Sequence, residues 1–189
     1  MGEMRKDSIL ERFMIISSGN GKSIDSKKSP FSPGNEAMTN PSVLSLVARD
    51  GMLQRLQDSE DSYVKGWTIR VFESKNPAVS ITTENTYSDK PHYSEPAYGY
   101  HYIVVASPNQ NDSFATINVE QWSNILVVIQ DRLRWLYTQK GVTYVSIYAN
   151  HGKEAGAEIS HPHLHVVTFS TIPPVIEAEA EATHRILNE

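Results

Sequence analysis

Three histidines alternate along one short stretch of the chain, and their type and spacing suit them for chemistry. They are His161, His163 and His165, and a run of apolar and β-branched residues follows them. Successive side chains of a β-strand point to opposite faces, so an extended backbone would place the three imidazoles on one face. Upstream, Gly152 and Gly156 frame a loop whose bare backbone can approach a ligand. The pattern predicts a strand and a loop that handle phosphate.

A row of three imidazoles admits three interpretations. In the first, a ring nitrogen of His163 attacks phosphorus and forms a phosphoramidate, while its two neighbours donate hydrogen bonds to phosphate oxygens or protonate the leaving group. In the second, the row binds a metal such as zinc, with Glu158 as the nearest carboxylate. In the third, the histidines only pack and form hydrogen bonds. We favour nucleophilic catalysis by His163, with His161 and His165 flanking it.

Composition narrows the class of protein. The chain has 189 residues, of which 39% are hydrophobic and 21% charged, which is typical of one soluble globular domain over residues 1–189. A formal net charge of -5 argues against broad binding to nucleic acid. The absence of cysteine excludes disulfides and thiolate metal sites and fits a cytoplasmic protein. We expect no membrane partner, because no apolar run could span a bilayer and no signal peptide is evident.

Periodicity and turn residues locate the elements that must position the histidines. Apolar residues at helical spacing predict a main helix over residues 118–140, with Asn118 as its N-cap, Gln121 answering that cap and Gly141 ending the helix. A second, acidic helix is expected over residues 175–187. Besides the histidine strand, β-rich runs predict strands at residues 12–17, 66–72, 78–82, 100–107 and 142–149. Polar and proline-bearing stretches predict mobile loops at residues 18–40 and 84–98.

The order of these elements predicts an α+β fold. Two strands joined by a short loop after the main helix favour antiparallel pairing. We therefore expect a mostly antiparallel sheet of about five strands, with the main helix packed on one face and a further C-terminal helix. Within residues 66–72, alternation predicts that Trp67, Ile69 and Val71 share one face.

The motif H-P-H-L-H resembles the histidine-triad superfamily, in which histidine alternates with apolar positions. The stretch from Asn150 to His163, with N-H-G, then Gly156, then H-P-H, resembles the active-site segment of galactose-1-phosphate uridylyltransferases. The segments MRKDSILERFMIIS, SPFSPGNE and RVFESKNPAV resemble motifs of the N-terminal half of that family, in the same order. The resemblance implies a histidine-triad-like fold and a homodimer.

The resemblance further implies a covalent nucleotidyl-histidine mechanism, in which His163 carries the nucleoside monophosphate. The expected activity is that of a nucleotidyl transferase or hydrolase acting on a nucleoside diphosphate or polyphosphate, including nucleotide sugars. The alternatives are a non-catalytic nucleotide- or metal-binding protein that has lost the zinc site, and a half that works only with a second half. The residues implied in substrate binding are Asn150, Gly152, Gly156, Glu158, Ser160, Ser74, Lys75 and Asn76.

The chain also departs from the family pattern. Ser29, Ser32 and Gln110 stand where zinc ligands are expected and only His161 of that set remains, so we predict no structural zinc and no other cofactor. His165 replaces a glutamine, which favours hydrolysis or transfer to another acceptor. Glu158 replaces a phosphate-binding Ser or Thr, and its carboxylate should repel phosphate unless it is protonated or turned away. We interpret His101, on the predicted strand at 100–107, as structural.

Overall fold

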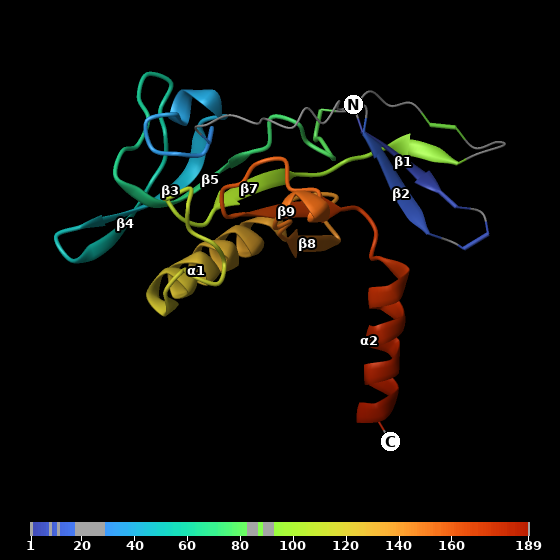
Figure 1. Cartoon of the computed structure of the whole chain (residues 1–189). Coiled ribbons are helices and arrows are strands. Elements are labelled where there is room, and N and C mark those ends of the chain that lie inside the picture. The colour runs from blue at the N-terminus through green and yellow to red at the C-terminus, as the bar shows by residue number, and fades with distance from the viewer. Residues whose placement is uncertain are drawn as a thin grey trace.

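All strand pairs among the residues that the structure describes are antiparallel, and they form two sheets (Figure 1). The computed structural model describes residues 2–7, 9–10, 12–17, 29–82, 87–88 and 93–188. The large sheet has the order β4-β3-β5-β7-β9-β8 and the small one β2-β1-β6. The α+β prediction is confirmed, with six strands in the main sheet. The strands are β1 (Gly2–Lys6), β2 (Phe13–Ser17), β3 (Ser42–Arg49), β4 (Met52–Leu56), β5 (Trp67–Glu73), β6 (Ser94–Pro96), β7 (His101–Val105), β8 (Tyr144–Tyr148) and β9 (His163–Phe169).

The helices are α1 (Val119–Leu136), α2 (Pro174–Leu187) and the short 3-10 turns η1 (Glu36–Met38) and η2 (Lys153–Ala155). Helix α2 extends away from the sheets, and none of its residues is buried (Figure 1). Within the described part of the chain, neither helix combines the length and the apolar character needed to cross a bilayer.

Helix α1 begins and packs largely as the sequence predicts. The Asn118 side chain accepts a hydrogen bond from the backbone N–H of Gln121 at 2.8 Å, which satisfies one otherwise unpaired donor of the first turn. The expected return bond from Gln121 is wrong: its side-chain amide donates instead to the carbonyl oxygens of Thr68 and Ala106. These two bonds tie the start of the helix to β5 and to the end of β7. The buried face of α1 consists of Ile125, Val128, Ile129 and Leu136.

Two predictions about the strands are wrong. Residues 78–82 form bends rather than a strand, because Ala78 donates its N–H to a histidine side chain and Ser80 donates to the carbonyl of Ala97. Within the expected loop at 84–98, residues 94–96 instead form β6, which pairs with β1. The parts of the two predicted loops at 18–28, 84–86 and 89–92 lie outside the described residues.

The large sheet has an apolar cluster on each face, and a β-bulge in β5 decides which cluster Trp67 joins. Leu46 pairs with Ile69 whereas Val47 pairs with Trp67, so β5 contributes one extra residue at this point. Trp67 is thereby turned away from Ile69 and Val71, contrary to the prediction that the three share a face. One face packs under α1 through Ile69, Val71, Tyr102, Val104 and Val166. The other face carries Phe31, Val47, Trp67, Phe72, Ile103 and Val105.

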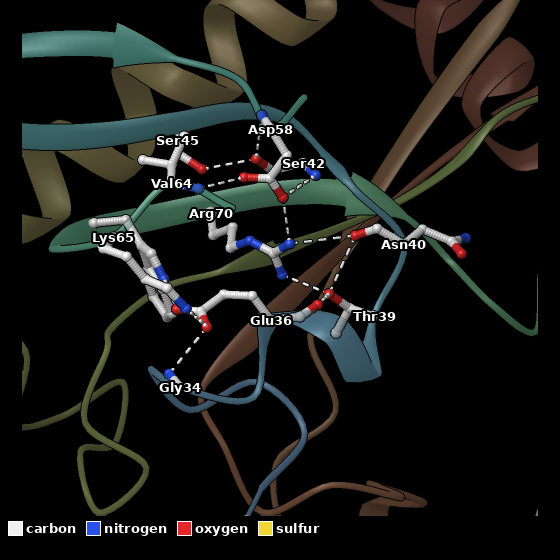
Figure 2. Close-up of polar contacts among 11 residues, drawn as sticks. Gly34, Glu36, Thr39, Asn40, Ser42, Ser45, Asp58, Val64, Lys65 and Arg70 are labelled. Atoms are coloured by element: carbon white, nitrogen blue, oxygen red, sulfur yellow. Dashed lines mark hydrogen bonds and ion pairs between the residues drawn. The ribbon is translucent and has the colours of Figure 1, made fainter. Parts of the chain in front are cut away.

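A buried polar network fixes the segment 29–40 over this second face (Figure 2). The Arg70 guanidinium contacts the Asp58 carboxylate at 2.7 Å and also donates to the Thr39 hydroxyl, and the Arg70 and Asp58 side chains are 2% and 0% exposed. Nearby, Glu36 accepts from the Lys65 ammonium and from the Trp67 indole. Burial raises the pKa of Glu36, but hydrogen bonds from Lys65, from backbone amides and from Trp67 outweigh it and lower that pKa to about 2. Glu36 is therefore charged at neutral pH and anchors the segment to β5.

The Arg70–Asp58 pair should contribute far more to stability than an exposed pair of equal length. Asp58→Ala leaves the guanidinium buried without its partner, so we expect it to lower the free energy of unfolding by about 3–5 kcal/mol. The matched control is Asp131→Ala, which removes the 2.7 Å pair with Arg55 on the surface and should cost about 0.2–1 kcal/mol. Urea unfolding measures both variants. Equal losses would contradict the assigned role of the buried network.

Candidate active site

The three imidazoles share one face of the sheet at β9. The His163 and His165 rings lie edge to face with their centroids 5.0 Å apart. The Phe31 ring packs against both His161 and His163, at centroid distances of 6.0 and 5.1 Å. Alternating with these residues, Leu164 and Val166 belong to the opposite cluster beneath α1. The alternation of the sequence thus becomes a row of imidazoles over the central strands.

One hydrogen bond decides which nitrogen of His163 is available for chemistry. Its Nδ1 lies 2.6 Å from the carbonyl oxygen of His161, and a carbonyl can only accept. The proton of a neutral ring therefore sits on Nδ1, and Nε2 carries a free lone pair. Among the described residues, none forms a hydrogen bond with Nε2. Burial lowers the pKa of His163, against smaller raising effects of the His161 carbonyl and the Glu158 charge, so the ring is neutral at pH 7.

The residues at the expected zinc position bond to one another instead of forming a ligand set. The Gln110 side-chain oxygen accepts from the Ser29 backbone N–H at 3.1 Å and from the Ser32 hydroxyl at 3.2 Å. Zinc in proteins is held by thiolates, imidazoles and carboxylates, so two hydroxyls, one amide and His161 do not fit it. Within the described residues, no group of three or more His, Cys, Asp or Glu side chains could hold a metal ion.

His161 itself is held by a carbonyl at the end of β7. Its Nε2 donates to the backbone oxygen of Ser107 at 2.6 Å, and its Nδ1 is buried with no partner among the described residues. Burial is the main effect that lowers the pKa of His161, so this ring is also neutral. The residue thus anchors the start of the row to the backbone just after β7.

A cavity of about 660 Å³ opens at the His161 end of the row. Gly152 and Gly156 have φ angles of 82° and 79°, which favour glycine, and they turn the loop between β8 and β9 back toward this cavity. Gly156 is not part of the wall. Glu158 is exposed there, and its charge acts on the His163 ring. The cavity brings together five of the predicted site residues, namely Asn150, Gly152, Glu158, Ser160 and His161.

Ser74, Lys75 and Asn76 lie at the opposite end of the row. They form the turn after β5, and the Ser74 backbone N–H donates to the carbonyl oxygen of His101 at 2.8 Å. His101 in turn contacts His165 through a 3.0 Å hydrogen bond. Lys75 and Asn76 are exposed and free to meet a ligand. His163 therefore stands between a cavity on one side and this turn on the other.

Sequence reasoning missed three neighbours of the row. His101, interpreted as structural, bonds to His165, and Tyr148 on β8 stacks on the His165 ring at 4.9 Å with an interplanar angle of 11°. Phe31 covers His161 and His163. Of the three, only Tyr148 lies close to the histidine motif in the sequence. Strand pairing brings His101 and Tyr148 to the row, whereas Phe31 comes from the segment before β3, and neither arrangement has a local signature in the sequence. Burial lowers the pKa of His101 to about 4 and that of His165 to about 3, the latter with help from its histidine neighbours.

Comparison with known proteins agrees with this geometry. A family model, the N-terminal domain of galactose-1-phosphate uridyl transferase, matches residues 55–173, which is more than half of the chain. An ADP-glucose phosphorylase of Arabidopsis thaliana is 26% identical over 194 residues, covering 99% of this chain and 54% of the relative. A galactose-1-phosphate uridylyltransferase of Thermotoga maritima is 28% identical over 125 residues, covering 65% of this chain and 39% of the relative.

Solved structures share the fold over the whole described chain. A uridylyltransferase superposes with a TM-score of 0.73 at 20% identity, covering 97% of this chain and 50% of the other. The Arabidopsis thaliana ADP-glucose phosphorylase with bound ADP-glucose gives a TM-score of 0.66 at 22% identity, covering 100% and 55%. The chain thus spans about half the length of the relatives that it matches end to end. By its sequence and its fold, it belongs to the galactose-1-phosphate uridyl transferase family, in the part that forms the N-terminal domain.

Proposed function

We propose that the chain transfers a nucleotidyl group from a nucleotide sugar or a related nucleoside diphosphate, through a covalent intermediate on His163. The observation that carries the proposal is the Nδ1–H of His163 held by the His161 carbonyl, because it leaves the Nε2 lone pair as the free nucleophile. The relative named ADP-glucose phosphorylase, whose structure holds ADP-glucose, supports this substrate class. We further propose that the protein is cytoplasmic and forms a homodimer.

The chemistry divides into two displacements at phosphorus. Nε2 of His163 attacks the α-phosphorus, a nitrogen–phosphorus bond forms, and the bond from phosphorus to the bridging oxygen breaks with its electron pair going to the leaving phosphate. An oxygen of the acceptor then attacks the same phosphorus and returns the electron pair to Nε2. In this arrangement the cavity beside His161 receives the leaving and accepting phosphate groups. The turn at Ser74 lies on the nucleoside side.

Backbone groups rather than cations would carry much of the phosphate binding. Among the described residues, the cavity is lined by one lysine, Lys153, and by the carboxylates of Asp112 and Glu158. Amides of the loop that begins at Gly152 are neutral donors and would have to offset the repulsion by these carboxylates. We expect Glu158 to turn outward when substrate binds, which its exposed position permits.

The decisive variant is His163→Ala. Incubation with ADP-glucose and UDP-glucose, each labelled in the nucleotidyl group, should give an acid-labile, alkali-stable protein adduct with the wild type. The variant should form none, because the only nucleophile in the scheme is gone. The matched control is His184→Ala on the exposed helix α2, which should be labelled like the wild type. Nucleotide binding without any adduct would favour a non-catalytic binding protein, and equal labelling of His163→Ala would refute the mechanism.

The pH dependence of adduct formation should report the neutral His163 ring. Burial lowers its pKa below the ordinary 6.5, so the single-turnover rate should stay level from about pH 8 to pH 6.5 and fall only at more acidic pH. The His163 imidazole is protonated at a higher pH in the unfolded chain than in the folded one. The free energy of unfolding therefore also decreases as pH falls below 6.5. Circular dichroism at each pH separates the two effects. A rate that falls with a midpoint at or above 6.5 in the folded protein contradicts the assignment.

We also propose that the chain folds and reacts without zinc. Because Gln110, Ser29 and Ser32 already satisfy one another, treatment with a chelator should leave both the melting temperature and adduct formation unchanged. Elemental analysis should find far less than one zinc per chain. A triple variant, Ser29→Cys with Ser32→Cys and Gln110→His, is the positive control, since with His161 it supplies two thiolates and two imidazoles. Stoichiometric zinc in the wild type, removed with loss of stability, would contradict the proposal.

A further inference from the structure

His101 contacts the third histidine of the row from the neighbouring strand. Nε2 of His101 lies 3.0 Å from Nδ1 of His165, and the ring centroids are 5.3 Å apart. In the β7–β9 register His101 lies opposite Val167 while Ile103 lies opposite His165, so the two imidazoles meet on the diagonal of the antiparallel pair. His101 is 8% exposed, so the contact is shielded from water.

The direction of this hydrogen bond follows from its neighbours. The backbone N–H of Ala78 donates to Nδ1 of His101 at 3.1 Å. A backbone amide can only donate, so Nδ1 of His101 carries a lone pair and the single proton of the neutral ring sits on Nε2. This Nε2–H must then donate to Nδ1 of His165. In the neutral His165 ring the remaining proton is therefore on Nε2.

The position of His165 leaves that Nε2–H free beside the nucleophile. Nδ1 and Nε2 lie on roughly opposite sides of an imidazole, so Nε2 of His165 points away from His101. Among the described residues, no group accepts a hydrogen bond from it. Tyr148 stacks on one face of the ring and the His163 ring meets it edge to face. The ring plane is thus held by two aromatic contacts and one hydrogen bond.

We propose that His101 is a positioning residue that holds His165 as the Nε2–H tautomer, so that a neutral imidazole donates a hydrogen bond to a phosphate oxygen next to His163. The proposal rests on the proposed function of the same site. A His165 ring in this tautomer presents a neutral N–H, as a glutamine amide would. The low pKa values of His101, about 4, and of His165, about 3, agree with two neutral rings.

Nitrogen NMR of the ¹⁵N-histidine-labelled wild type tests the hydrogen bond itself. Protonated and unprotonated ring nitrogens have well-separated shifts, and an N–H···N bond gives a ¹⁵N–¹⁵N coupling between the two rings. We expect His165 with a protonated Nε2, an unprotonated Nδ1 and a coupling from Nδ1 to Nε2 of His101. Spectra of His165→Gln and His101→Phe assign the signals. A His165 ring protonated on Nδ1, or no coupling, would overturn the proposal even if adduct formation were confirmed.

A double-mutant cycle tests whether His101 acts through His165. His101→Phe keeps a ring but removes the N–H that fixes the tautomer of His165. Adduct formation should therefore slow at least about tenfold, which is less than the 10²–10³-fold loss that follows outright removal of a donor to the substrate. In the His165→Gln background, whose amide needs no tautomer, the same replacement should change the rate less than about twofold. His101→Gln, which keeps an N–H near the Nε2 position, should recover most of the rate.

Equal losses from His101→Phe in both backgrounds would assign His101 a merely structural role and overturn the proposal. If His101→Phe does not fold, the comparison of His101→Gln with the wild type and the NMR of the wild type still decide. If the wild type forms no adduct at all, the proposed function fails, whereas the tautomer of His165 remains measurable on its own.

Discussion

The hydrogen bond from Nδ1 of His163 to the carbonyl oxygen of His161 is the constraint on which the chemistry of this site depends. It joins two residues of the same short segment, so the backbone conformation before β9 sets the tautomer of the nucleophile. In the other tautomer, His163 would present a protonated Nε2 to the substrate and could not attack phosphorus through it. Everything around His163 can be understood as support for this one orientation.

That support reaches the row through a chain of packed side chains. The Arg70 guanidinium, fixed by Asp58, lies 5.0 Å from the Phe72 ring centroid, and Phe72 packs on Phe31 at 5.5 Å. Phe31 in turn packs edge-on against His163. The buried Arg70–Asp58 pair therefore supports Phe31, and Phe31 shields the His163 ring from water. Loss of the ion pair should disturb the position of Phe31 at the site as well as lower the free energy of unfolding.

The sequence predicts the parts of this arrangement that have a local period. Alternation placed the three imidazoles on one face, and helical spacing located α1. The bulge that turns Trp67 over, and the strands β3 and β4, have no such period. Glu36 falls in a stretch that reads as a loop, yet it is 2% exposed because Lys65 and Trp67 meet it from other elements.

The contact between His101 and His165 could not be predicted from the sequence for the same reason, since it joins residues 64 positions apart through a strand register.

The most direct measurement of the central claim is a crystal structure of the protein trapped after reaction with a nucleotide sugar. The account predicts phosphorus bonded to Nε2 of His163, with Nδ1 still 2.6 Å from the His161 carbonyl as in the free protein. Phosphorus on Nδ1, or on a different residue, would contradict it.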